Sequence, residues 1–224
     1  DLFLLEIGPD ALPHYVKTAI TYVAENGGAE ITDTLTVLVG RPQILLVNDS
    51  PNQSERVEAY YRETLDLLNV TYTLWRTGDT TVPDSYEEYP VMLWFTGDDT
   101  LGESISAADT AIIAQYMSTG GCVILTGQNM TSQFPYGFLE NRFGAAHKAT
   151  GGSAVAVGIG SGPISFESDN VILFGYPGLS NQNVALVTGI SPCGGTPLYA
   201  FNTGDTCAVS YENGVNKMVW ACMF

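Results

Sequence analysis

The pattern of hydrophobic and polar positions changes near residue 43 of this 224-residue chain. Before that point, apolar and β-branched side chains recur in short runs, and two of these runs alternate with polar positions at a period of two. The runs are residues 2–7, 15–24 and 31–39. Asn26-Gly27-Gly28 is a tight-turn sequence and indicates a hairpin between the last two. The pattern predicts that residues 1–40 are a β-rich segment, the end of a preceding β-sandwich-like domain.

From Gln43 onward, continuous apolar runs replace the alternation, which is typical of parallel strands covered on both faces. These predicted strands are residues 44–47, 70–75, 91–95 and 122–126. Helical patterns lie between and after them, at residues 55–68, 107–117 and 132–143, with one short helical turn at 84–89. Ser106 is the expected N-cap of the second helix, and Glu58 and Arg62 form an i,i+4 pair on the first, away from its apolar stripe.

Strands that alternate with helices predict βαβ units, and hence an α/β fold with an open, doubly wound, mostly parallel sheet. After Gly144 the helical periodicity fades, and His147 falls in an expected loop. Short strands separated by turns are predicted at residues 155–157, 171–174, 184–187, 198–201, 207–211 and 217–223, which adds antiparallel strands at the C-terminal end. We therefore expect one α/β domain over residues 41–224, joined to the β-rich segment by Gly40-Arg41-Pro42.

Composition narrows the classes of partner. The chain carries 24 acidic and 8 basic residues, a net charge of −16, and such a surface repels phosphate backbones and anionic lipids. We expect no nucleic-acid partner and no membrane insertion, since no window approaches the roughly 18 consecutive apolar residues of a membrane span. The chain opens on Asp1-Leu2-Phe3 without a signal peptide, which leaves open a cytoplasmic protein or a fragment of a longer secreted one.

Polar side chains gather where the predicted parallel strands end. They are Asn48, Asp49, Asp98, Asp99, Gln128 and Asn129. Ligands of open α/β sheets bind outside the carboxyl ends of the strands, so these residues are the candidate ligand site. The carboxylates of Asp49, Asp98 and Asp99 could hold Ca²⁺ or Mg²⁺ through oxygen ligands, or the group could bind sugar hydroxyls; Ca²⁺ is the cofactor that we carry forward. The alternative is structural, because Asp and Asn also cap helices and form Asx-turns in such loops.

The chain has four cysteines, none with C-x-x-C spacing, and only two histidines, a composition that disfavours a zinc site. Cys193 and Cys207 both lie in turn-rich surroundings. If the protein is exported, these two are the expected disulfide.

Several of these segments resemble a known family. They include Ile44-Leu-Leu-Val-Asn-Asp, Val91-Met-Leu-Trp-Phe-Thr-Gly-Asp-Asp, Gly120-Gly-Cys-Val-Ile-Leu-Thr-Gly-Gln-Asn and the closing Lys217-Met-Val-Trp-Ala-Cys-Met-Phe. Together they are similar to the class I glutamine amidotransferase-like domains of large secreted bacterial proteins, where such domains often follow β-sandwich modules or peptidase domains. The resemblance implies a flavodoxin-like core, a secreted or cell-surface location, and a multidomain parent such as a peptidase.

A catalytic member of that family needs a nucleophile on the sharp turn after the central strand, with a histidine to activate it. The matching turn is Thr126-Gly127-Gln128-Asn129-Met130, which contains neither Cys nor Ser. The sequence therefore predicts a non-catalytic accessory or interaction domain that packs against other domains of its parent and binds a protein or a glycan. Two alternatives stay open: a hydrolase of the same group with an atypical site at the strand ends, and a Ca²⁺-stabilised binding module.

Overall fold

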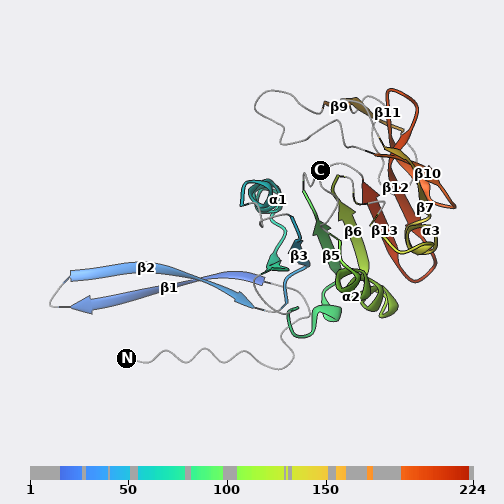
Figure 1. Cartoon of the computed structure of the whole chain (residues 1–224). Helices are drawn as coiled ribbons and strands as arrows, with labels where there is room; N and C mark the ends of the chain where they lie inside the picture. Colours follow the sequence, from blue (N-terminus) through green and yellow to red (C-terminus); the bar gives the residue numbers. More distant parts are fainter. Residues whose placement is uncertain are drawn as a thin grey trace.

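The structure is a computed structural model of the whole chain. It describes residues 16–26, 29–39, 41–50, 55–78, 82–97, 105–128, 130, 133–150, 155–159, 171–173 and 188–221. Within these residues, most strands belong to one large mixed sheet and two form a separate hairpin (Figure 1).

One half of the large sheet is parallel. Its strands are β3 (Ile44–Asn48), β4 (Tyr72–Arg76), β5 (Val91–Phe95), β6 (Cys122–Thr126) and β13 (Lys217–Ala221). They lie in the order β4-β3-β5-β6-β13, with each neighbouring pair parallel. Counted along the chain, this is the 2-1-3-4-5 order of flavodoxin-like folds. The predicted α/β class with an open, doubly wound sheet is confirmed.

The other half of the sheet is antiparallel, as predicted for the C-terminal strands. It continues from β13 through β12 (Thr206–Glu212), β11 (Thr196–Phe201), β8 (Val155–Gly158) and β9 (Val171–Leu173). Beside β12 runs β10 (Thr188–Pro192), which pairs with β7 (Ala145–Thr150). The predicted loop around His147 is wrong, because this residue lies in β7. The predicted strand at 184–187 falls outside the described residues.

Helices cover both faces of the parallel half (Figure 1). They are α1 (Glu55–Leu67) and α2 (Ala107–Ser118). A 3₁₀ turn, η2 (Tyr86–Glu88), precedes β5, and the short α3 (Phe138–Phe143) follows β6 and packs beside β7, β12 and β13. Ser106 caps α2 in a capping box with Asp109, as the sequence predicts. The third helix is shorter than expected because Gly137, with a left-handed φ of 78°, forms its N-cap.

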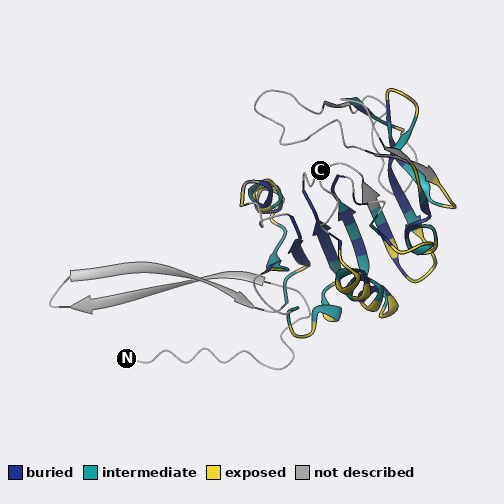
Figure 2. Ribbon diagram, viewed as in Figure 1, coloured by how far each residue is buried: buried dark blue, intermediate teal, exposed yellow. Residues whose placement is uncertain are grey.

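The core divides into two layers because side chains on a strand alternate between faces. Leu46 and Phe95 pack under Val57 and Leu65 of α1. Leu45 and Trp94 pack on the opposite face with Ile113, Tyr116 and Met117 of α2. β3 is accordingly buried along its whole length and β5 over all but its first residue (Figure 2). Trp75 and Trp94 also lie in this core.

The N-terminal hairpin consists of β1 (Val16–Asn26) and β2 (Ala29–Val39). They pair antiparallel along their whole length, from Val16 opposite Val39 to Asn26 opposite Ala29, which confirms the predicted hairpin. Residues 2–7 lie outside the described residues, and the assignment of residues 1–40 to a preceding β domain stays a prediction. None of the helices in the described ranges is long and apolar enough to cross a membrane.

Candidate functional site

The polar edge of the sheet lies where β3, β5 and β6 end. β3 and β5 are neighbours in the sheet, but the chain continues from β3 into α1 on one face and from β5 into α2 on the other. Open α/β sheets bind ligands at such a point, where the connections change from one face of the sheet to the other. Backbone hydrogen bonds hold the strand ends together: the Asp49 amide donates to the Phe95 carbonyl at 2.9 Å, and the Gln128 amide donates to the Gly97 carbonyl at 3.0 Å. The structure thus brings Asn48, Asp49 and Gln128 to one edge of the sheet. Asp98, Asp99 and Asn129 lie outside the described residues.

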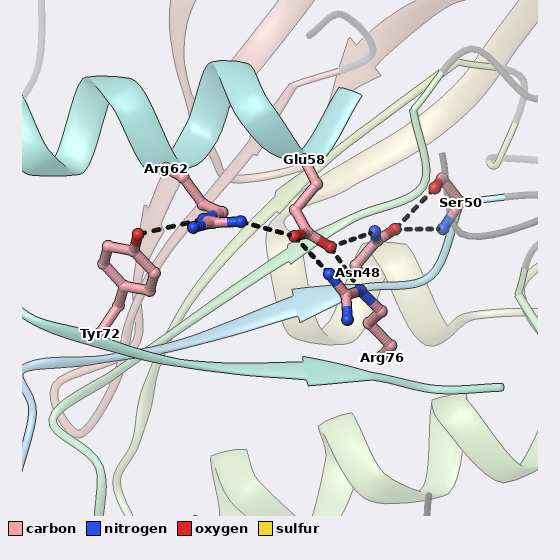
Figure 3. A network of polar contacts seen from close by, with 6 residues as sticks. All are labelled: Asn48, Ser50, Glu58, Arg62, Tyr72 and Arg76. Carbon is pink, nitrogen blue, oxygen red and sulfur yellow. Dashed lines mark hydrogen bonds and ion pairs between the residues drawn. The ribbon is translucent and has the colours of Figure 1, made fainter. Parts of the chain in front are cut away.

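A buried polar network joins this edge to α1 (Figure 3). Its centre is Glu58, whose side chain is only 2% exposed. The Arg76 guanidinium donates two hydrogen bonds to the Glu58 carboxylate, both at 2.7 Å, and the Asn48 amide donates a third at 3.0 Å. The other end of the Asn48 side chain accepts from the Ser50 hydroxyl and backbone amide. Asn48 is therefore a structural link between α1 and the chain after β3.

The contacts of Glu58 decide its charge. Burial alone would raise the pKa of this carboxyl, but hydrogen bonds from Arg76 and Asn48 and the Arg76 charge together lower the pKa below its usual value of 4.5. Glu58 is thus ionised at neutral pH. The expected pairing with Arg62 is present at 3.4 Å, but it is a secondary contact, and the prediction that this glutamate lies away from the buried side of the helix is wrong.

Asp49 is held on the other face of the sheet. One of its carboxylate oxygens accepts from the Trp94 indole at 2.9 Å, and the other accepts from the Thr77 hydroxyl at 2.7 Å. Its exposed fraction is 8%. Both oxygens thus carry protein hydrogen bonds that fix Trp94 in the core and join β3 to the end of β4. The structural interpretation of this residue accounts for every contact described here.

The turn after β6 is closely packed. A Cβ atom added to Gly127 would lie 1.8 Å from the Thr96 hydroxyl oxygen, so only glycine fits beside this threonine. Gln128, the next residue, is fully buried. The Thr96 hydroxyl is also buried, and among the described residues it has no hydrogen-bond partner. The described part of this turn is therefore closely packed by backbone and core atoms.

Tyr61 closes the same edge from α1. Its hydroxyl lies 2.6 Å from the Thr126 hydroxyl, and its ring stacks on Phe95 with centroids 4.2 Å apart. Burial raises the pKa of the Tyr61 phenol well above its usual range, although the contact with Thr126 opposes the rise. Tyr61 thus keeps its phenol proton at neutral pH.

The metal prediction rests partly on residues outside the described ranges, whereas both cysteines of the predicted disulfide lie within them. Within the described ranges, no group of three or more His, Cys, Asp or Glu side chains could hold a metal ion. A calcium site that includes Asp98 and Asp99 stays a prediction. Cys193 is exposed in the turn before β11, whereas Cys207 is buried in β12, where burial raises the pKa of its thiol to about 12. Their disulfide stays a prediction, and the mass of the protein before and after reduction tests it.

Glu58, Arg76, Tyr61 and Thr96 are the residues of this edge that sequence reasoning missed. The signal for the first pair is weak: Glu58 directly follows the core residue Val57, and Arg76 is the last residue of β4. Only the parallel pairing of β3 with β4 places Arg76 beside Asn48. Long-range pairing of this kind is invisible in local patterns.

Comparison with known proteins supports the fold and no more. No family model and no curated protein sequence matches the chain. An exo-β-1,4-mannosidase from an Opitutaceae bacterium, strain TAV5, matches over 81% of this chain at 14% identity and a TM-score of 0.56, and the chain spans 31% of its length. A cytoplasmic protein of Salmonella typhimurium LT2 matches over 93% of this chain and 85% of its own, at 12% identity and a TM-score of 0.52.

A glutamine amidotransferase from Methylobacillus flagellatus also matches, over 79% of this chain and 67% of its own, at 9% identity. Its TM-score of 0.48 is too low to carry an argument. What the similar structures establish is an α/β fold that occurs both in a chain of similar length and as a part of a larger enzyme.

Proposed function

We propose that this chain is a non-catalytic accessory or interaction domain of a larger secreted or cell-surface bacterial protein. The observation that carries the proposal is the occupation of the strand-end edge by the protein itself. The Asp49 carboxylate accepts from Thr77 and Trp94, the Asn48 amide is bonded to Glu58, and Gly127 packs on Thr96. Side chains that are committed to buried structural bonds are poorly placed to act as acids, bases or nucleophiles.

The match to the mannosidase supports the multidomain part of the proposal, because the chain corresponds to 31% of that enzyme. The resemblance of the sequence to amidotransferase-like domains suggests the secreted parent, with a peptidase as its catalytic partner. The Salmonella protein of similar fold is cytoplasmic, so the fold alone does not support a secreted or cell-surface location. Identifying what precedes Asp1 in the full-length protein tests export directly.

The competing proposal is a hydrolase with an atypical site at the strand ends. A screen of esterase, amidase and glutaminase substrates separates the two. We expect no turnover by the wild-type chain above that of Asp49→Asn and Asp98→Ala variants, which remove carboxylates from the candidate edge. Turnover that disappears in either variant, while circular dichroism shows an intact fold, would establish the hydrolase and reject the accessory role.

The calcium-stabilised module is tested by thermal melting of the wild-type chain with Ca²⁺ and with EDTA. We expect the same Tm in both conditions, because each carboxylate oxygen of Asp49 already accepts a hydrogen bond from the protein. A Tm that rises with added Ca²⁺ and falls with EDTA, and that no longer responds in Asp98→Ala, would support a structural calcium site.

A further inference from the structure

A shallow hollow of about 380 Å³ lies beside α3, on a part of the chain that the strand-end site does not use. Its lining residues are Pro135, Tyr136, Gly137, Phe138, Asn141 and Arg142. All six come from one short stretch that enters and forms α3, so the hollow belongs to this domain and needs no second one.

The hollow has one exposed and one anchored aromatic ring. Tyr136 is fully exposed, although burial of its ring would be favourable. Phe138 is half-buried and stacks on Phe134, with centroids 5.2 Å apart and rings nearly parallel. Phe138 also contacts Phe143 of the core, with centroids 6.3 Å apart. The floor of the hollow is therefore fixed to the core, whereas the Tyr136 ring is presented to solvent.

The polar side chains of the hollow are uncommitted. Within the described part of the chain, neither Asn141, which is exposed, nor Arg142, which is half-buried, makes a side-chain hydrogen bond or ion pair. Gly137 has φ of 78°, and a Cβ there would lie 3.2 Å from the Asn141 amide nitrogen. Glycine at this position keeps the space beside the amide open. An exposed ring and two sets of unused donors thus converge on one recess.

We propose that this hollow binds neutral sugar residues of a glycan. A pyranose ring has an apolar face of C–H bonds that can pack on Tyr136, and its hydroxyl groups can accept from Arg142 and both donate to and accept from Asn141. The net charge of −16 disfavours polyanionic ligands and so favours a neutral glycan over a uronate or a phosphate. The inference deepens the proposed interaction role by naming its ligand class and its residues.

Affinity electrophoresis of the whole chain tests the site. Native gels would contain neutral glucan, mannan, galactan or xylan, with polygalacturonate as the charged comparison. We expect at least one neutral polysaccharide to retard the wild-type chain. Tyr136→Ala and Arg142→Ala should each weaken binding about tenfold or more, and Asn141→Ala should do so to a smaller extent. Tyr60→Ala removes another exposed tyrosine, on α1, and should leave retardation unchanged.

The inference would be overturned by retardation by no neutral polysaccharide, or by retardation that Tyr136→Ala leaves within about twofold of wild type. Retardation by polygalacturonate alone would also overturn it, in favour of carboxylate recognition by Arg142. Circular dichroism of each variant separates lost binding from lost fold. Failure here leaves the accessory role standing, since the activity screen addresses the strand-end edge, which contains none of the residues of the hollow.

Discussion

The Thr96 hydroxyl is buried between β5 and β6, where the Gly127 backbone lies directly against it. It has no hydrogen-bond partner among the described residues, so burial removes its hydrogen bonds to water and no protein hydrogen bond replaces them. Such a group costs about 1–3 kcal/mol relative to one that is hydrogen-bonded.

Replacing this hydroxyl with a methyl group should therefore be tolerated. We expect Thr96→Val to unfold in urea with a free energy equal to or up to about 1 kcal/mol above wild type, because it removes the uncompensated group and keeps the shape. Thr110→Val is the matched control: its hydroxyl donates to the Ser106 carbonyl at 2.9 Å, so its loss should destabilise by about 1 kcal/mol. A clear loss of stability in Thr96→Val would instead mean that the hydroxyl is bonded in solution.

Two arginines contact Glu58, and only one of them should matter for stability. Arg76→Ala leaves the buried carboxylate without its bidentate partner and should lower the free energy of unfolding by about 2 kcal/mol. The loss is smaller than for a fully buried pair because Arg76 itself is partly exposed and solvent screens its charge. Arg62→Ala removes a half-exposed partner at 3.4 Å and should cost about 0.5 kcal/mol or less. Urea unfolding of both variants measures the difference. Equal losses of unfolding free energy would contradict the claim that Arg76 is the main partner of Glu58.

The same network predicts how stability depends on pH. The folded-state pKa of Glu58 lies below its unfolded value of 4.5, so the stabilisation is complete above the unfolded pKa and is lost as the pH falls through the folded pKa. The difference in unfolding free energy between wild type and Glu58→Gln should be constant near neutral pH and shrink in acid. A difference that grows on acidification would show that the folded-state pKa is raised.

At the scale of elements, side chains fix both ends of α2, but only those at the N-terminal end could be predicted from the sequence. The N-terminal capping box of Ser106 and Asp109 follows from a local pattern. The C-terminal end depends on Asn216, which lies about 100 residues later, just before β13. Its buried side-chain amide donates to the Met117 carbonyl at 2.7 Å and to the Gly121 carbonyl at 2.9 Å.

Asn216→Ala should therefore destabilise the whole domain by about 2 kcal/mol, because the Met117 carbonyl in α2 and the Gly121 carbonyl before β6 each lose a hydrogen bond from the buried amide. Thermal melting and urea unfolding measure the loss. Asn202→Ala, which changes an exposed asparagine in the turn after β11, should be neutral and serves as the control. If Asn216→Ala were equally neutral, water would be able to replace the amide.

The strands also show which elements can be predicted from local patterns. Apolar runs such as those of β5 and β6 predict their bounds closely, because a strand covered on both faces has few polar positions. β7 has the sequence Ala-Ala-His-Lys-Ala-Thr, which has little intrinsic preference for a strand. Its pairing with β10 makes it one, and that pairing joins segments about forty residues apart.

At the scale of the whole molecule, the fold class was predictable and the arrangement of the second half was not. Alternating strands and helices restrict residues 44–126 to few topologies, because parallel crossovers are right-handed. No comparable rule orders β8, β11 and β12, whose antiparallel neighbours depend on long-range packing. The location of the candidate edge could be predicted, because βαβ units bring the ends of parallel strands together. The hydrogen bonds that occupy it could not be predicted, because they depend on Arg76, Thr77 and Trp94.

The core also predicts that the α/β domain folds without the N-terminal segment. Among the residues whose burial the structure describes, which begin at Arg41, every core residue is Ile44 or later. Arg41 is held in place by Glu88, by the Ser85 carbonyl and by the Tyr89 ring. A chain of residues 41–224 should therefore melt cooperatively within about 3 °C of the full chain. A chain that starts at Asp49 lacks the central strand β3 and should not fold. Unfolding of the 41–224 chain would contradict the boundary at residue 40.

The contact between Gly127 and Thr96 also has an evolutionary consequence. A serine or cysteine introduced at position 127 would place its Cβ 1.8 Å from the Thr96 hydroxyl oxygen and 3.0 Å from the Thr96 Cβ, which no χ1 rotation moves away. A nucleophile at position 127 therefore needs a smaller residue at position 96 first. That first change brings no catalytic benefit of its own, so a lineage that carries this pair is held away from enzymatic activity at this turn by the order in which mutations would have to occur.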